Sequence, residues 1–203
     1  MDKKIVYTVM LGNYKLNEPE YENNDWKFVC FTNQKVSSKN WTIININSNN
    51  PRKKAREIKI MYNRYLDFDI SLFIDAKFKI KCDLNKFIKK NLKYDISLMN
   101  HNRRNCIYDE AKFCIDKNIG NKKNILNQIS FYRSKGFPSK FGLYATGILI
   151  RRNTPEVIKF MKLWYNEIKE FSYRDQISFP FILWKNPIKF GTMPFKKTYG
   201  EFK

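Results

Sequence analysis

The segment of residues 70–81, ISLFIDAKFKIK, is the feature that most constrains the fold of this chain. Its first five residues are apolar apart from one serine, and such a run is typical of a strand buried on both faces of a parallel α/β sheet. Asp75 follows at the carboxyl end of that strand, where open α/β sheets bind ligands. The alternative is that Asp75 begins a turn between this strand and a second, short strand formed by the alternating residues 77–81.

Length and composition favour one packed domain. With 203 residues, 43% of them apolar and 16% aromatic, the sequence can form a single domain over residues 1–203. No window approaches the roughly 20 apolar residues of a membrane span, and Met1-Asp-Lys-Lys leads into a strand-like run instead of a signal peptide. Because the four cysteines show no CxxC spacing, we expect reduced, mostly buried thiols and a cytoplasmic protein: Cys30, Cys82, Cys106 and Cys114.

The chain is strongly basic, with 39 Lys and Arg residues against 19 Asp and Glu and a net charge of +20. Such an excess favours anionic partners: nucleic acid, an acidic membrane surface or a phosphorylated small molecule. The sequence is also rich in Asn and Ile, so a solvated surface that follows from an AT-rich coding composition explains part of this charge equally well.

Strands alternate with helices along the first half of the sequence, which predicts an α/β fold with a mainly parallel central sheet flanked by helices. Thr154 and Pro155 have the residue types of an N-cap and a first helical position. We expect strands at residues 4–12, 25–33, 41–47, 70–75, 95–99 and 142–150. We expect helices at residues 52–66, 84–92, 108–117 and 122–134, a long helix that begins at residue 155, and a last helix at 175–184. A basic, aromatic tail follows the last helix.

A polar stripe follows one side of the helix expected at residues 52–66. Arg52, Arg56, Lys59 and Asn63 recur at helical spacing, opposite the apolar residues. Three cations on one face can clamp a diphosphate, with arginine offering two parallel hydrogen bonds. An ordinary solvated basic face is the alternative. Since the sequence contains neither a Walker A pattern nor GxGxxG, P-loop and dinucleotide-binding functions lose their main support.

Two further blocks combine several polar residue types. Residues 101–111, HNRRNCIYDEA, contain the only histidine, two arginines and two acids at the entry to a helix. Residues 172–179, SYRDQISF, place an arginine, an acid and an amide in succession. Acids in a first helical turn also interact favourably with the helix dipole, so capping remains an alternative to function for both blocks.

Taken in order, these motifs resemble a glycosyltransferase-like family long catalogued as domain-of-unknown-function family 616. The resemblance runs from Tyr7 to Trp184 and is carried by Cys-Phe-Thr32, Ala-Arg-x-x-Lys59, Phe-Ile-Asp-Ala-Lys77, His-x-x-Arg-x-Cys-Ile-Tyr-x-Glu-Ala111 and Arg-Asp-Gln-Ile-Ser-Phe179. It implies a GT-A fold, with a Rossmann-like, nucleotide-sugar-binding half in residues 1–81 and an acceptor-side half in residues 82–203.

The resemblance also implies roles for individual residues. The donor nucleotide sugar, a UDP-sugar at family level, would be bound by the first half together with a glycine of the sixth strand: Thr8, Val9, Leu11, Tyr14, Thr32, Asn33, Arg56, Lys59, Asp75, Ala76, Lys77 and Gly147. The glycan or glycoconjugate acceptor would be bordered by Arg104, Tyr108 and Gln176. The catalytic set would be Asp175, Glu110 and His101, with Asp175 as first and Glu110 as second candidate for the base that deprotonates the acceptor.

The sequence departs from the family pattern at Lys77, which occupies the second acid position of the DxD-like element that begins with Asp75. We expect Asp75 to bind Mn²⁺ or Mg²⁺ together with donor phosphate oxygens. Alternatively, Lys77 or the Lys196–Lys197 tail supplies the positive charge. A degenerate binder of nucleotide sugars and a nucleic-acid-binding module remain competing functions, although we expect no specific nucleic acid partner. The basic surface also predicts peripheral membrane association.

Overall fold

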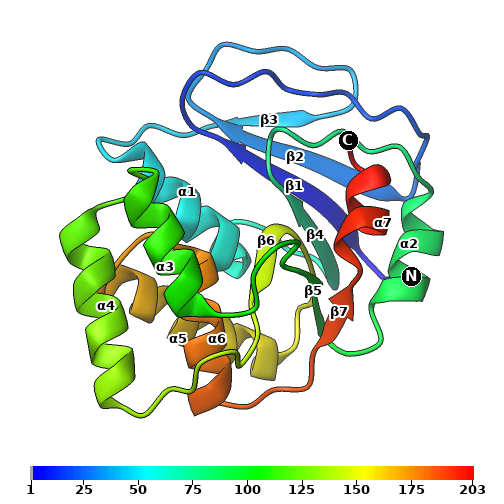
Figure 1. Cartoon of the computed structure of the whole chain (residues 1–203). Helices are drawn as coiled ribbons and strands as arrows, with labels where there is room; N and C mark the ends of the chain where they lie inside the picture. The colour runs from blue at the N-terminus through cyan, green and yellow to red at the C-terminus, as the bar shows by residue number, and fades with distance from the viewer. Residues whose placement is uncertain (1) are drawn as a thin grey trace.

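Seven strands form one mixed sheet in the order β3-β2-β1-β4-β6-β5-β7 (Figure 1). The computed structural model describes residues 2–203. The strands are β1 (Lys4–Met10), β2 (Trp26–Thr32), β3 (Thr42–Asn45), β4 (Ile70–Ile74), β5 (Ile96–Asn100), β6 (Tyr144–Arg152) and β7 (Gly191–Met193). All five residues of β4 are buried, as the apolar run at residues 70–74 predicts.

Strand β6 alone runs against the others. It pairs antiparallel with both β4 and β5, whereas β1 pairs parallel with β2 and β4, β2 with β3, and β5 with β7. The order β3-β2-β1-β4 matches the first four positions of the Rossmann strand order 3-2-1-4-5-6. The prediction of an α/β fold with a mainly parallel sheet and a Rossmann-like first half is therefore confirmed.

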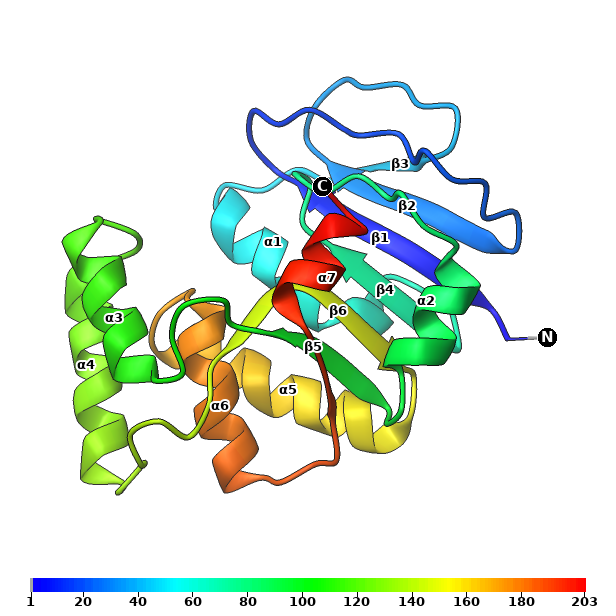
Figure 2. The ribbon, with the colours of Figure 1, turned by 45° about the vertical axis from the view of Figure 1, so that its right-hand side comes forward.

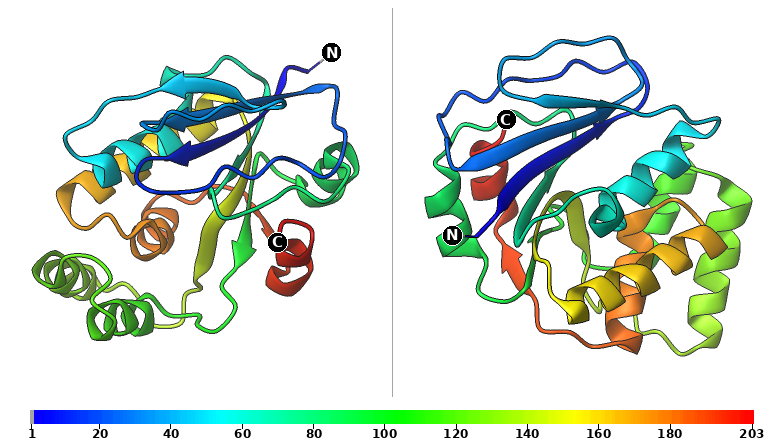
Figure 3. Two further views of the ribbon diagram at one scale, coloured as in Figure 1. Left: turned by 90° about the horizontal axis from the view of Figure 1, so that it is seen from above. Right: turned by 180° about the vertical axis from the view of Figure 1, so that it is seen from behind.

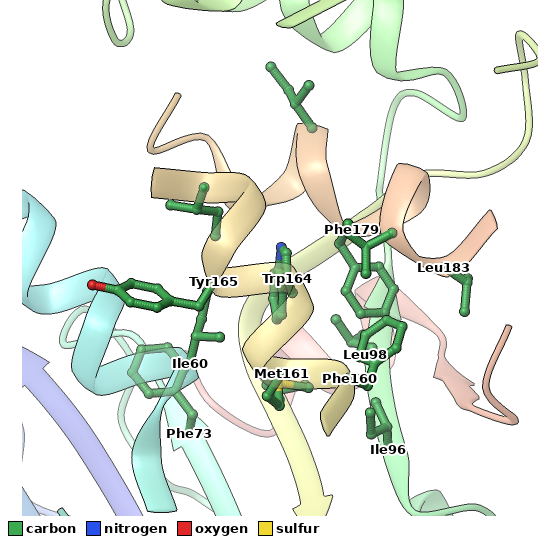
Figure 4. Close-up of a cluster of buried hydrophobic side chains, with 14 of the residues drawn as sticks. Ile60, Phe73, Ile96, Leu98, Phe160, Met161, Trp164, Tyr165, Phe179 and Leu183 are labelled. Carbon is green, nitrogen blue, oxygen red and sulfur yellow. The ribbon is translucent and has the colours of Figure 1, made fainter. Parts of the chain in front are cut away.

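Most of the helices lie on one side of the sheet (Figure 1). Helices α1 (Pro51–Ile60), α5 (Pro155–Glu170) and α6 (Asp175–Lys185) enclose the larger hydrophobic core, in which Trp164 and Phe179 pack edge to face with ring centroids 5.0 Å apart (Figure 4). Helices α3 (Ile107–Asp116) and α4 (Lys122–Ser134) lie side by side outside α6 (Figure 3). Thr154 caps α5 by accepting the backbone N–H of Val157, as expected.

The opposite side of the sheet carries less helix. Helices α2 (Leu84–Asn91) and α7 (Phe195–Gly200), together with the long loops that follow β1 and β4, cover a second core around Trp41, Phe78 and Phe202 (Figure 2). Of the cysteines, Cys30, Cys106 and Cys114 are buried, while Cys82 is half-buried. Across residues 2–203, no helix has the length and apolar character that crossing a membrane requires.

One predicted helix bound is wrong, the alternative of a second strand after Asp75 does not hold, and the tail contains elements that were not predicted. Residues 77–81 are not a strand, since their backbone bonds to loops and to the C-terminus, as in Lys79 N to Phe202 O at 2.8 Å. Helix α1 ends at Ile60, six residues early, and a 3₁₀ turn over Tyr62–Arg64 follows. The C-terminal tail is not irregular: it forms β7 at the edge of the sheet and then α7.

Candidate active site

The carboxyl ends of β4 and β5 and the start of the antiparallel β6 meet at one edge of the sheet. A cavity of about 480 Å³ opens there. It is lined by residues from both halves of the chain: Asp75, Lys77, Phe78, Met99, His101, Asn102, Arg103, Arg104, Phe113, Ala145, Gly147, Gln176, Phe195 and Tyr199. Six residues predicted from the sequence thus converge on one cavity: Asp75, Lys77, His101, Arg104, Gly147 and Gln176.

The position of Asp75 depends on the absence of a side chain at Gly147. The Asp75 backbone N–H donates to Gly147 O at 2.8 Å. A Cβ atom on Gly147 would lie 2.7 Å from Asp75 Oδ2 and 3.1 Å from the Phe78 ring. Since real Cβ atoms essentially never come that close, any larger residue would displace the carboxylate. Glycine was expected here to admit the donor; in the structure it first makes room for Asp75.

A break in the pairing of β5 with β6 shapes the cavity wall. Leu98 pairs with Leu149 but the next residue, Met99, pairs with Ala145, so Thr146, Gly147 and Ile148 have no partner on β5. Irregularities of this kind re-aim side chains and are over-represented beside active sites. Here the irregularity gives the Thr146 hydroxyl and Gly147 two different neighbours, Lys59 and Asp75 respectively.

A buried ion pair lies behind this wall. Lys59 Nζ lies 2.6 Å from Asp175 Oδ2, and the Thr146 hydroxyl accepts from Lys59 at 3.1 Å and donates to Asp175 at 3.0 Å. Arg56 Nε approaches the same carboxylate oxygen at 3.5 Å. Burial alone would raise the pKa of Asp175, but the Arg56 and Lys59 charges outweigh it and hold that pKa well below its usual range. Burial lowers the pKa of Lys59, and the charges of Asp175 and Asp75 oppose that shift.

The backbone of Lys59 is held as firmly as its side chain. Its carbonyl, at the end of α1, accepts from the Tyr7 hydroxyl at 2.6 Å and from Arg151 Nη1 at 3.0 Å. Arg151 is fully buried, and its guanidinium stacks on Tyr62, 3.9 Å from the ring centroid. Both cations, Lys59 and Arg151, are therefore buried, and neither lines the cavity.

Glu110 connects the two most specific sequence blocks. Its carboxylate accepts from Arg104 Nε at 2.7 Å and from Arg174 Nη2 at 3.2 Å, and lies 3.7 Å from His101 Nε2. His101 Nδ1 accepts the backbone N–H of Arg104 at 3.0 Å, so the neutral ring carries its proton on Nε2. Burial lowers the pKa of His101, and the charge of Glu110 opposes that shift.

A second cavity, of about 500 Å³, lies between the end of β1 and the start of α1. Leu11 and Tyr14 line it from one side and Asn50, the N-cap of α1, and Arg52 from the other. Helix N-termini favour anions through their free N–H groups and dipole. Asn33 accepts the backbone N–H of Gly12, and Thr32 donates to Met10 O, so these two residues hold the loop after β1.

Other predicted residues lie outside both cavities. Asp175 and Glu110 are 2% and 1% exposed. Thr8 is buried and its hydroxyl has no hydrogen-bond partner among residues 2–203, and Val9 is only partly exposed. The Tyr108 hydroxyl donates to Phe137 O, and the backbone carbonyl of Ala76 accepts from Asn17.

The four residues of the predicted polar stripe do not share one surface. Arg52 lines the second cavity, Arg56 and Lys59 contact Asp175, and Asn63 lies beyond the end of α1.

Some residues that line the cavity beside Asp75 were not predicted from the sequence. Arg103 lay inside a motif that was recognised but was assigned no role, whereas Phe195 and Tyr199 lie in the tail, at an i, i+4 spacing that places them on one helix face. That spacing was the signal available in the sequence.

The few side-chain atoms that could bind a metal ion at the cavity limit what kind of metal site can form. The Asp75 carboxylate has no hydrogen bond or ion pair within residues 2–203, so its oxygens are available. In the same part of the chain no group of three or more His, Cys, Asp and Glu side chains could hold a metal ion. Mg²⁺ is commonly bound by one or two carboxylates plus substrate phosphates and water. Asp75 therefore does not form a protein-only metal site, and it fits a cation whose other ligands are phosphate oxygens and water.

Comparison with solved structures supports the class of fold. The chain resembles the apo structure of the bifunctional glycosyltransferase WbbM with a TM-score of 0.57 and 12% identity, covering 96% of this chain and 39% of the other. At that identity the likeness shows a glycosyltransferase fold and no more.

The family follows from the sequence comparison. A model of the TOD1/MUCI70 glycosyltransferase-like domain matches residues 3–198, so the chain belongs to that family. It is also 28% identical over 158 residues to the probable hexosyltransferase MUCI70 of Arabidopsis thaliana, covering 68% of this chain but 26% of the relative. The chain thus spans about a quarter of that relative's length. The prediction of a glycosyltransferase-like family is confirmed; its catalogue number stays a prediction.

Proposed function

We propose that this domain transfers a hexosyl or deoxyhexosyl group from a nucleotide-diphosphate sugar, a UDP-sugar in the first instance, to a glycan or glycoconjugate. The observation that carries the proposal is the cavity at the carboxyl edge of the sheet, which gathers six predicted residues from motifs up to 101 positions apart, from Asp75 to Gln176. Membership of the family and the hexosyltransferase relative support the same activity.

The two cavities would bind different parts of the donor nucleotide sugar. The nucleoside would bind between Leu11, Tyr14 and the start of α1, and the diphosphate and sugar beside Asp75. Departure of a nucleoside diphosphate develops negative charge, and neutralising such charge is usually the largest catalytic contribution. Lys77 and Arg103 line the cavity and would supply positive charge for this step, whereas the charge of Arg104 is paired with Glu110. A divalent cation held by Asp75 would supply further charge neutralisation at the diphosphate.

Asp175 and Glu110 fit positioning roles better than the role of a base. Each carboxylate is ion-paired with two cationic side chains, and neither lines the cavity. Asp175 holds Lys59 and Arg56, while Glu110 orients Arg104 toward the cavity. His101 lines the cavity and carries its proton on Nε2, which lies 3.7 Å from Glu110 Oε2.

A thermal-shift screen tests the donor site. UDP, GDP, CMP and dTDP are added with and without Mn²⁺ to wild type, Asp75→Ala, Gly147→Ala and the control Asp116→Ala, an exposed acid at the end of α3. A ligand at about 100 times its dissociation constant adds about 2.7 kcal/mol of stability. We expect one nucleotide to stabilise wild type and the control, more strongly with Mn²⁺, and both site variants to lose the Mn²⁺ effect. No shift with any nucleotide would contradict the proposal.

A turnover assay distinguishes an active enzyme from a degenerate binder of nucleotide sugars. The degenerate binder is a competing function because the exposed Lys77 stands where the family has a second acid. We expect wild type to release nucleoside diphosphate from the matching sugar nucleotide. Binding without release would favour the degenerate binder.

A further inference from the structure

The C-terminal segment is fixed against the loop that begins at Asp75. Phe202 is fully buried and its ring packs edge to face on Phe87 of α2, with centroids 5.0 Å apart. The backbone N–H groups of Lys79 and Lys81 donate to Phe202 O and Glu201 O at 2.8 and 3.1 Å. Helix α7 is therefore a preorganised wall of the cavity.

The inner face of α7 is aromatic. Phe195 and Tyr199 line the cavity and stack on each other, with centroids 5.2 Å apart and ring planes 16° from parallel. Tyr199 also packs edge to face on Phe78, whose ring lies beside Gly147. Both side chains remain partly exposed. Aromatic side chains that combine apolar faces with fixed rotamers are the usual lining of small-molecule sites, and the C–H faces of sugar rings pack on them.

The outer face of α7 is basic. Lys196 and Lys197 are exposed, and Lys197 lies close to Lys90 of α2, so that side-chain hydrogen bonding with Lys90 and then its charge lower the pKa of Lys197. The carboxylate of Glu201 lies 3.8 Å from the ammonium group of Lys90. Helix α2 adds Lys86 and Lys89, both exposed. Like charges held together in this way favour binding of an anion.

We propose that α7 binds the acceptor, and that the acceptor is an acidic glycan: a sugar ring packs on Phe195 and Tyr199 while carboxylate or phosphate groups further along the chain bind Lys196, Lys197 and Lys90. This inference rests on the proposed glycosyl transfer and adds to it the substrate class. A polymer fits the site because the aromatic cavity and the lysines lie on two faces of one helix. None of the large exposed apolar side chains of residues 2–203 lies on α7, which disfavours insertion into a lipid surface.

Titration of two oligosaccharides tests the proposal. A mannuronate hexamer and maltohexaose, equal in length but different in charge, are titrated into the full chain by calorimetry at low and high salt. We expect the acidic hexamer to bind at least about tenfold more tightly at low salt, and the difference to shrink as salt screens exposed charges. Equal affinities, or no binding of either, would overturn the proposal.

Paired variants locate the binding. Lys196→Gln/Lys197→Gln should weaken the acidic hexamer about fivefold at low salt, since exposed charge pairs are individually weak. Phe195→Leu/Tyr199→Leu keeps apolar volume but removes the aromatic faces, and should weaken both hexamers about tenfold. The control Lys122→Gln/Lys123→Gln removes two exposed lysines from α4. An equal loss of affinity in the control would overturn the assignment to α7.

Two further measurements separate the possible failures. Nucleotide thermal shifts on the same proteins report the donor site alone: shifts without hexamer binding reject this inference and leave the proposed function standing. Hexamer binding at α7 without any nucleotide shift rejects the proposed function and supports the acidic glycan site. Vesicles containing phosphatidylserine that bind in a Lys196- and Lys197-dependent way, with no hexamer binding, would identify a lipid surface and reject the inference.

Discussion

Lys59 is an ammonium group with 1% of its surface exposed, and its stability in that position depends on one carboxylate. Removing one partner of a buried ion pair leaves an uncompensated charge, which typically costs about 3–5 kcal/mol. The two residues are 116 positions apart, so the ion pair also joins the end of α1 to the start of α6.

We therefore expect Asp175→Asn to lower the free energy of unfolding by about 3 kcal/mol or more. Lys59→Met/Asp175→Asn should recover part of that loss, because the buried ammonium is removed and only the partly exposed Arg56 is left without its carboxylate. Urea unfolding curves of the three proteins measure both changes. If Asp175→Asn is as stable as wild type but lacks turnover, Asp175 is the catalytic base first predicted from the sequence.

His101 gives stability a pH dependence of known sign. Its pKa is lowered in the folded protein, chiefly by burial, whereas a histidine in the unfolded chain titrates near about 6.5. Between the two values the unfolded chain binds more protons. The contribution of neutral His101 is thus fully present above about pH 6.5 and is lost as the pH falls through the folded pKa.

We expect the free energy of unfolding of wild type to fall from pH 7 to pH 5 more steeply than that of His101→Gln. Urea unfolding at pH 5, 6 and 7 gives the two slopes. Parallel slopes would show that the environment of His101 does not disfavour its charged form.

The sequence identified Asp75, Gly147 and Gln176 because each lies in a local pattern, such as an acid ending an apolar strand. It could not identify the partners of Lys59. A lysine in a polar helical stripe is normally exposed, but here Lys59 is buried against Phe73 of β4, Thr146 of β6 and Asp175 of α6. Tertiary contacts of that kind leave no spacing signal.

At the scale of elements, α3, α6 and the loop after β5 depend on Glu110. Glu110 neutralises Arg104 in the loop and Arg174 at the start of α6, although it belongs to α3. Asp109, its neighbour, is exposed in the same first turn. The helix dipole acts on both acids, so a comparison of the two separates capping from the ion-pair network.

Glu110→Gln should cost about 3–5 kcal/mol, because two partly buried guanidinium groups lose their counter-charge. Asp109→Asn should cost no more than about 1 kcal/mol. Thermal unfolding of both variants makes the comparison. Similar small losses would mean that Glu110 only caps α3, and an unchanged stability with lost turnover would restore it as a candidate base.

The boundaries of two long helices were predicted well, whereas two short elements near the C-terminus were not predicted. Helix α4 has the predicted bounds, and α5 begins at Pro155 as expected. Strand β7 has three residues and α7 six, too few for either period to emerge. The direction of β6 was equally hidden, since an apolar run has the same pattern in parallel and antiparallel pairing.

At the scale of the whole molecule, the sheet separates two hydrophobic cores, and apolar strand residues contribute to both. Trp164 lies on the side of α5, and Phe202 on the side of α2 and α7. The cavity lies at the edge where both sides meet, because Gln176 reaches it from α6 and Tyr199 reaches it from α7. The division into a donor half and an acceptor half within one domain remains a prediction.

Phe202→Ala tests whether the two cores form one cooperative unit. Truncating a buried Phe typically costs about 3–5 kcal/mol, whereas Lys203→Ala, an exposed neighbour, should change stability by less than about 0.5 kcal/mol. If the chain is a single domain, the loss lowers the stability of everything that opens only by global unfolding. Hydrogen exchange should then show peptides of α5, on the far side of the sheet, losing protection together with peptides of α2. Loss of protection confined to α2 and α7 would instead mean that the C-terminal side opens on its own, and that the acceptor wall of the cavity can unfold while the donor side stays intact.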